Sequence, residues 1–72
     1  MKDYVKRMLD ERDELKARID KAQRFLDRNA QSMNTEDKEL LVRQVQIMWE
    51  YYSVLELRLA REGIGHGSDG KR

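Results

Sequence analysis

Residues 40–59 read LLVRQVQIMWEYYSVLELRL, and this stretch decides the fold. Its apolar side chains recur at alternating steps of three and four residues, which places them on one face of an α-helix. The first apolar row consists of Leu41, Val45, Met48, Tyr52, Leu55 and Leu59. A second row beside it consists of Leu40, Ile47, Tyr51 and Val54, and Trp49 lies off both rows. The pattern predicts a helix whose apolar sector is broader than one partner helix can cover.

The N-terminal part of the chain has the same period and predicts a second helix. Its apolar row resembles a coiled-coil seam with one charged member. That seam consists of Val5, Met8, Arg12, Leu15, Ile19, Ala22 and Leu26, and Leu9 and Phe25 widen it. Proline is absent and all four glycines follow residue 62, so nothing in residues 1–62 forbids a helix.

The order of these elements predicts an all-α fold with two long helices. We expect helix 1 at about 3–28 and helix 2 at about 35–62, because the segment 29–34 is polar and Asn34 or Thr35 can cap a helix. So short a loop favours an antiparallel helical hairpin over residues 1–62. The glycine-rich segment 63–72 predicts a flexible polar tail.

The length of the chain favours self-association. A domain of 72 residues buries only about 60% of the surface that its unfolded chain exposes. The chain has no cysteine and one histidine, so neither a disulfide framework nor a structural zinc site can supplement the core. Two or more hairpins packed together would bury the second apolar row. We therefore expect a compact homo-oligomer.

The charge balance argues against several classes of partner. The chain has 15 basic and 14 acidic side chains, so no net field attracts duplex DNA or a membrane surface. No apolar run approaches the roughly 18 residues of a membrane span, and the N-terminus lacks the apolar core of a signal peptide. We expect a cytoplasmic protein that binds neither membranes nor duplex DNA.

Enzymatic catalysis has little support in the sequence. The single histidine, His66, lies in the glycine-rich tail, without a cysteine or an ordered carboxylate at fixed spacing. The fourteen carboxylates are spread as charges over the helix faces, and the glycines follow the last helix instead of opening one as a phosphate loop would. We expect no catalytic residue, no metal and no cofactor.

Two basic groups on helix 1 are candidate sites for an anionic ligand. The group near Tyr4 consists of Lys2, Lys6 and Arg7, and the group near the end of the helix consists of Lys21, Arg24 and Arg28. An aromatic ring can stack on a base while cations neutralise phosphates. The same charges could form a solvated face, and Tyr4 could be a peripheral packing residue. In an oligomer, each interface would repeat such a pocket.

Two further arginines have two readings each. Arg12 in the seam can fix the register by pairing with a carboxylate, or it can line a central polar cavity. Arg58 lies on the wide face of helix 2, where a cation needs an anionic partner. That partner can be Glu56 or Glu62 at the rim, or a phosphate of a ligand.

Four segments together resemble a known family. They are YVKRM at 4–8, ELKARIDK at 14–21 with Phe25 and Leu26 after it, ELL at 39–41, and MWEYYSVLELRL at 48–59. Their order over about residues 4–61 resembles the second anti-CBASS family, the anti-CBASS protein 2 family of bacteriophages. Members of that family sequester cyclic oligonucleotide signals and so blunt CBASS immunity. The methionine-to-tyrosine segment followed by Val54, Leu55 and Arg58 is its most distinctive part.

The resemblance implies a homohexamer of hairpins and a set of ligand contacts. Cyclic dinucleotides would lie between subunits, and in some members cyclic trinucleotides lie in pockets on the threefold axis. Tyr4 would stack on bases, Lys21 would contact phosphates, and Arg58 would serve the trinucleotide pocket, while Gln23 stands where the family has a threonine. The candidate ligand-binding residues are Tyr4, Arg7, Met8, Lys21, Gln23, Arg24 and Arg58.

The resulting expectation is a phage anti-defence protein in the host cytoplasm. It would bind and sequester cyclic di- or trinucleotides without cleaving them. The alternative is a non-enzymatic helical oligomerisation or protein-interaction module, in which the wide face of helix 2 docks a protein or multimerises something larger. Sequence-specific DNA binding ranks third, because the chain shows neither a helix-turn-helix turn nor a net basic face.

Overall fold

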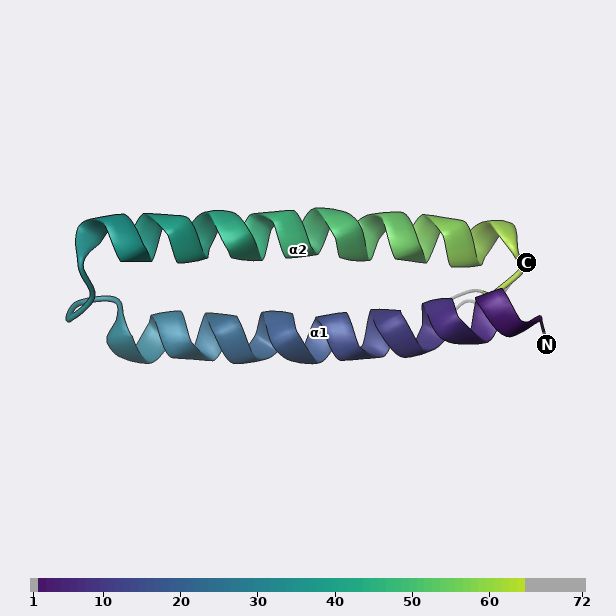
Figure 1. Ribbon diagram of the computed structural model, residues 1–72, viewed down its shortest axis with the longest axis horizontal. Coiled ribbons are helices and arrows are strands. Elements are labelled where there is room, and N and C mark those ends of the chain that lie inside the picture. The colour runs from purple at the N-terminus through teal and green to yellow at the C-terminus, as the bar shows by residue number, and fades with distance from the viewer. Residues whose placement is uncertain (1, 65–72) are drawn as a thin grey trace.

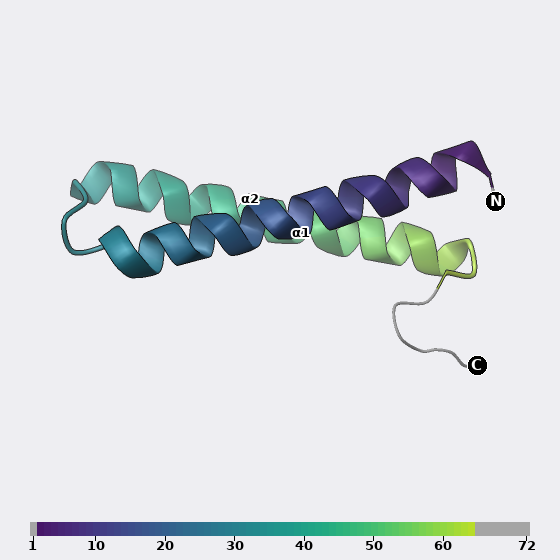
Figure 2. The same cartoon turned by 90° about the horizontal axis from the view of Figure 1, so that it is seen from below.

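The computed structural model describes residues 2–64, and within them the chain forms two α-helices and no strand. Helix α1 spans Asp3–Asn29 and helix α2 spans Thr35–Arg61. They lie side by side and antiparallel, with the connecting loop at one end and both ends of the described chain at the other (Figure 1). Turned by 90°, the helices cross at a shallow angle near their midpoints (Figure 2). The all-α antiparallel hairpin that the sequence predicts is confirmed.

Polar side chains end α1 and begin α2. The side-chain amide of Asn29 donates to the carbonyl oxygen of Phe25 at 2.9 Å, and the Ser32 hydroxyl donates to the carbonyl oxygen of Asn29 at 3.1 Å. The Asn29 carbonyl oxygen, at the end of α1, also accepts the backbone N–H groups of Ser32 and Met33 at 3.0 Å each. Asn34 caps α2, because its Oδ1 accepts a hydrogen bond from the Glu36 backbone N–H at 2.8 Å.

A glycine with positive φ ends α2. Gly63 has φ 87°, its N–H donates to the Ala60 carbonyl at 3.0 Å, and the Ile64 N–H donates to the Leu59 carbonyl at 2.9 Å. These two bonds form a Schellman cap, and Ile64 packs against the core beneath it. The predicted tail begins with this cap. Its remainder, residues 65–72 with His66, lies outside the described residues.

The core lies between the two predicted seams. Seven side chains are buried among residues 2–64, and all belong to those seams: Val5, Met8, Leu15, Ile19, Val45, Leu55 and Leu59. The second row of α2 stays open to solvent, with exposed fractions between 41% and 65% for Tyr51, Val54, Ile47 and Leu40. The prediction that one partner helix cannot cover α2 is therefore confirmed.

Trp49 and Arg12 lie along the same margin of the seam, since the Lys16 ammonium, one turn after Arg12, lies 5.9 Å from the centroid of the Trp49 ring. Trp49 is half-buried against the core and meets Tyr52 edge to face, with 5.5 Å between the ring centroids. The Arg12 guanidinium lies 3.4 Å from a Glu56 carboxylate oxygen and 3.3 Å from Asp13. Of its two readings, the structure therefore shows the pairing with a carboxylate across the hairpin.

No helix within residues 2–64 combines the length and the hydrophobicity needed to cross a lipid bilayer.

Candidate functional site

One flank of α1 carries charges of both signs beside the open row of α2. These side chains recur at steps of three and four residues and are named here the charged flank: Arg7, Glu11, Glu14, Arg18 and Lys21. Together with side chains of α2 they line two neighbouring grooves that share Arg18. The predicted site residues Arg7 and Lys21 therefore lie on the same side of the hairpin.

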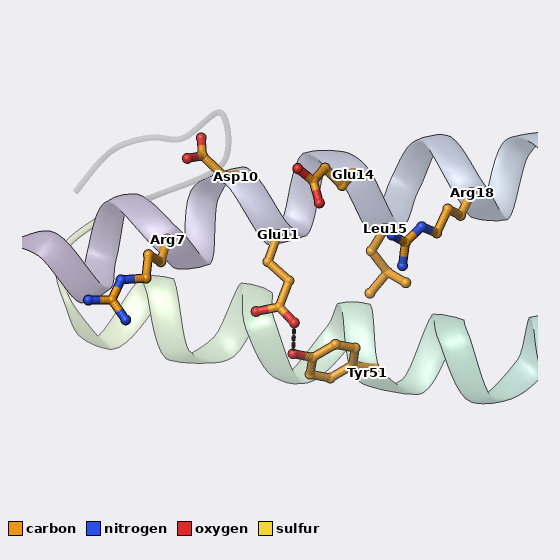
Figure 3. A pocket seen from close by; sticks show the side chains of 7 residues that line it. All are labelled: Arg7, Asp10, Glu11, Glu14, Leu15, Arg18 and Tyr51. Carbon is orange, nitrogen blue, oxygen red and sulfur yellow. Dashed lines mark hydrogen bonds between the residues drawn. The ribbon is translucent and has the colours of Figure 1, made fainter.

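The first groove is shallow and mainly acidic. It has a volume of about 370 Å³ and is lined by Arg7, Asp10, Glu11, Glu14, Leu15, Arg18 and Tyr51. Figure 3 shows Arg7 and Arg18 at its two ends, with the Tyr51 ring and Glu11 between them. Because three carboxylates face two guanidinium groups, the centre of this groove disfavours a phosphate.

Tyr51 is tied to α1 inside this groove. Its hydroxyl donates a hydrogen bond to the Glu11 carboxylate (Figure 3). This bond raises the pKa of Tyr51 above its ordinary value of 10.0, and partial burial and the charge of Glu11 act in the same direction. The bond fixes one ring of the otherwise open α2 row against the first helix.

The second groove combines cations with an exposed ring over an apolar floor. It is lined by Arg18, Lys21, Ala22, Phe25, Leu41, Gln44 and Met48. The Phe25 ring is 49% exposed beside the two cations. An aromatic anion suits this arrangement, since the ring can stack on a base while Arg18 and Lys21 neutralise phosphate charge. Sequence reasoning counted Phe25 as part of the seam and overlooked its exposed edge.

Gln23 lies on the other flank of the hairpin from Lys21. It lines a third groove with Leu26, Asp27, Val42, Val45, Gln46 and Trp49. Residues two positions apart in an α-helix are separated by about 200° around its axis, so the side chains of Lys21 and Gln23 point to different sides. Within one protomer, Lys21 and Gln23 therefore line different grooves.

Tyr4 belongs to a cluster at the open end of the hairpin, named here the open-end cluster and formed by Lys2, Tyr4 and Glu62. The Tyr4 hydroxyl donates to Oε2 of Glu62 at 2.7 Å, and the Lys2 ammonium lies 3.7 Å from Oε1 of Glu62. The same ammonium lies 3.5 Å from the Tyr4 hydroxyl oxygen and 5.7 Å from the ring centroid. The bond to Tyr4, followed by the charges of Tyr4 and Glu62, raises the pKa of Lys2 above 10.5.

The remaining predicted site residues differ in exposure. Met8 is 5% exposed and packs in the core, so its side chain supports the contact between the helices instead of facing a ligand. Arg24 is exposed on α1. Arg58 is exposed in the last turn of α2, and its charge acts on Tyr51 by lowering that pKa.

Tyr4 and Lys21 are far apart within one protomer. They are separated by 17 positions of a continuous helix, which corresponds to about 26 Å at 1.5 Å per residue. One small ligand cannot bridge that distance along a single α1. A pocket that uses both side chains must therefore take them from different subunits.

Metal chemistry finds no support in the described part of the chain. Residues 2–64 contain no group of three or more histidine, cysteine, aspartate or glutamate side chains placed to hold a metal ion.

Comparison with known proteins gives a family. No curated protein and no solved structure matches the chain. A family model described as Sequestin matches residues 2–61, which include both helices, the loop, every candidate ligand-binding residue named from the sequence and also Phe25. The match covers most of the 72 residues, and the chain therefore belongs to the Sequestin family.

Proposed function

We propose that this protein binds cyclic oligonucleotides and sequesters them without cleaving them. The observation that carries the proposal is the groove in which Phe25, Arg18 and Lys21 surround an apolar floor. Membership in the Sequestin family supports it, because that name is compatible with a sequestering protein. A ligand with bases and phosphates uses both parts of the groove.

The groups of a cyclic dinucleotide can be matched with the aromatic and cationic side chains of two subunits. A cyclic dinucleotide carries two phosphates and two bases, so it needs an aromatic surface and one or two cations from each of two subunits. Stacking of one base on an aromatic side chain contributes on the order of 1–3 kcal/mol. Phe25 and Lys21 of one subunit, with Tyr4 of another, supply these groups.

Assembly into a homohexamer is the second part of the proposal. The open row of α2 supports self-association, because four large apolar side chains in one line are seldom left in water. Assembly would also bring Tyr4 of one subunit to Lys21 of the next, which the length of α1 prevents within a protomer. Arg58, in the last turn of α2, would serve cyclic trinucleotides on the threefold axis.

The biological role follows from sequestration. We propose a bacteriophage protein of the anti-CBASS type, active in the cytoplasm of the infected host. By holding the signal in intact form, it would prevent CBASS effectors from responding. Such a protein needs neither a metal nor a cofactor, because the ligand is not transformed.

The first experiment measures mass and binding on one sample. Light scattering gives the subunit number, and calorimetric titration with a panel of cyclic di- and trinucleotides gives affinity. Saturable sub-micromolar binding with chromatographic recovery of intact ligand supports the proposal. Degraded ligand, or no heat with any member of the panel, overturns it.

Matched variants locate the pocket. We expect Tyr4→Ala, Lys21→Ala and Phe25→Ala to reduce dinucleotide affinity at least tenfold with unchanged mass. Arg58→Ala should weaken trinucleotide binding and spare dinucleotides. Lys38→Ala is the control for Lys21→Ala, because Lys38 is also an exposed lysine but lies in the first turn of α2 and outside the second groove.

A protein-interaction module is the second candidate, and the open row of α2 favours it. In that case the row docks a protein, and Tyr4→Ala and Lys21→Ala leave the behaviour of the protein unchanged. A smaller oligomer that is indifferent to every cyclic nucleotide would overturn the first candidate and leave the interaction module as the working hypothesis.

A further inference from the structure

Glu62 occupies an unfavourable position unless the first residues of α1 stabilise it. It is the C-cap residue of α2, at the end of the helix where the macrodipole is negative and a carboxylate is disfavoured. Only 27% of its side chain is exposed, and its two oxygens meet the Tyr4 hydroxyl at 2.7 Å and the Lys2 ammonium at 3.7 Å. Two donors at the start of the opposite helix, the N-cap residue Lys2 and Tyr4 of α1, therefore offset this unfavourable position.

The same two donors are suited to a phosphate. An ammonium and a hydroxyl bind phosphate oxygens by charge-assisted hydrogen bonds, as they here bind carboxylate oxygens. The ammonium also lies 5.7 Å from the centroid of the Tyr4 ring, so a cation and an aromatic surface adjoin each other. We propose that Lys2 and Tyr4 form a phosphate-binding pair, and that Glu62 is its internal competitor, displaced when a ligand phosphate binds.

This inference rests on the proposed function in one respect, since the phosphate is assigned to a cyclic oligonucleotide. Its consequence is selectivity by charge. A phosphate replaces both contacts of the carboxylate, whereas an uncharged nucleoside offers no group that compensates Lys2. Glu62 thus weakens binding at this pair, and a ligand without phosphate gains no contact with Lys2 that offsets the loss.

Substitution of the competitor tests the inference. Glu62→Gln keeps the size of the side chain and removes its charge, so a cyclic dinucleotide should bind about fivefold or more tightly than to the unsubstituted protein. That factor corresponds to one unit charge removed from about 4 Å in water. Glu39→Gln is the control, because Glu39 is an exposed carboxylate near the loop end of α2 and should leave affinity unchanged.

A double variant separates displacement from a general gain in helix stability. If Lys2 is the cation that the phosphate binds after displacing Glu62, then Glu62→Gln should no longer raise the ligand affinity once Lys2 has been replaced by Met. Equal affinity of Glu62→Gln and the unsubstituted protein, or a gain that survives the loss of Lys2, overturns the inference while the proposed function stands.

Inorganic phosphate provides a readout that does not depend on the cyclic ligand. Titration is followed by the NMR signals of the Tyr4 ring. A response at lower phosphate concentration in Glu62→Gln than in the unsubstituted protein supports the pair, even if no cyclic oligonucleotide binds and the proposed function fails. Identical titrations of the two proteins overturn it.

Discussion

Arg12 shows how one side chain can choose the register of two helices. It interrupts the apolar seam of α1, and its side chain is 19% exposed beside Glu56, which is 15% exposed. A partly buried charge requires a partner, and Glu56 supplies one from 44 positions away. Sliding α1 along α2 would separate this pair. A seam of apolar residues alone would tolerate such sliding.

We predict that breaking this pair costs more than replacing it. Arg12→Leu and Glu56→Gln should each lower the free energy of unfolding by about 1–2 kcal/mol, because each removes a partner from a partly buried charge. The double variant Arg12→Leu/Glu56→Leu should return to within about 1 kcal/mol of the unsubstituted protein. Urea denaturation followed by circular dichroism measures all three. Strictly additive losses would contradict the role in register.

From the hydrogen bond of Tyr51 we predict that the free energy of unfolding falls in alkaline solution. Its hydrogen bond to Glu11 raises its pKa above 10.0, so the folded state holds the phenolic proton more tightly than the unfolded state. The stabilising contribution is complete below 10.0 and is lost as the pH rises through the raised pKa. Lys2, whose pKa is also raised, acts in the same direction above 10.5.

Thermal melts between neutral and strongly alkaline pH test this expectation. The melting temperature should fall less steeply for Tyr51→Phe than for the unsubstituted protein. Tyr52→Phe is the matched control, because Tyr52 packs against the core and Trp49. The same slope in Tyr51→Phe and the unsubstituted protein would show that the Glu11 bond does not contribute.

At the scale of the element, the ends of α2 are specified by different chemistry. Asn34 supplies a hydrogen-bond acceptor at the start of α2. The acidic Glu36 and Asp37 follow in the first turn, where their negative charges interact favourably with the positive end of the helix dipole. Gly63 supplies the left-handed backbone at the end. Both capping signals are local in sequence. They set the two ends of α2, because the apolar period inside the helix does not change and marks neither end.

Gly63→Ala is expected to destabilise the hairpin by about 1 kcal/mol, although an added Cβ would meet nothing within 4 Å. The penalty comes from φ 87°, which side chains of L-residues rarely adopt. Gly63→Asn should lose less, since asparagine tolerates this region better. Denaturant unfolding of the two variants checks the order. A neutral Gly63→Ala would mean that the cap opens at no cost.

At the scale of the whole molecule, the hairpin is long and thin and leaves one face unfinished. Its dimensions are 45 × 22 × 14 Å, and two helices in contact bury only their facing seams. The charged flank and the open α2 row lie on the same side. This side therefore presents both the groups for a ligand and the surface for another subunit.

Assembly should depend on that row and not on exposed apolar residues in general. We predict that Ile47→Glu lowers the mass measured by light scattering, because it places a charge in the middle of the row. Leu57→Glu should leave the mass unchanged, although Leu57 is 68% exposed, since its own row contains Arg43 and Glu50 at heptad spacing. Equal effects of both changes would place the interface elsewhere.

The sequence alone determined the helices, their antiparallel pairing and the excess of apolar surface on α2. Each of these follows from local information, namely the apolar period, the polar loop and the glycines after residue 62. The helical period also places Lys21 and Gln23 on different flanks of α1. The family resemblance grouped these two residues because they are close in sequence, and it took no account of this angle.

Only the tertiary structure decided which residues of α1 lie opposite which residues of α2. The contacts of Tyr4 with Glu62 and Tyr51 with Glu11 depend on it, as does the second groove, which Phe25 lines. The physical reason is that a period specifies the angle of a side chain around its own helix axis. The axial register between two helices is set by loop length and by side-chain packing across the seam, which no single segment encodes.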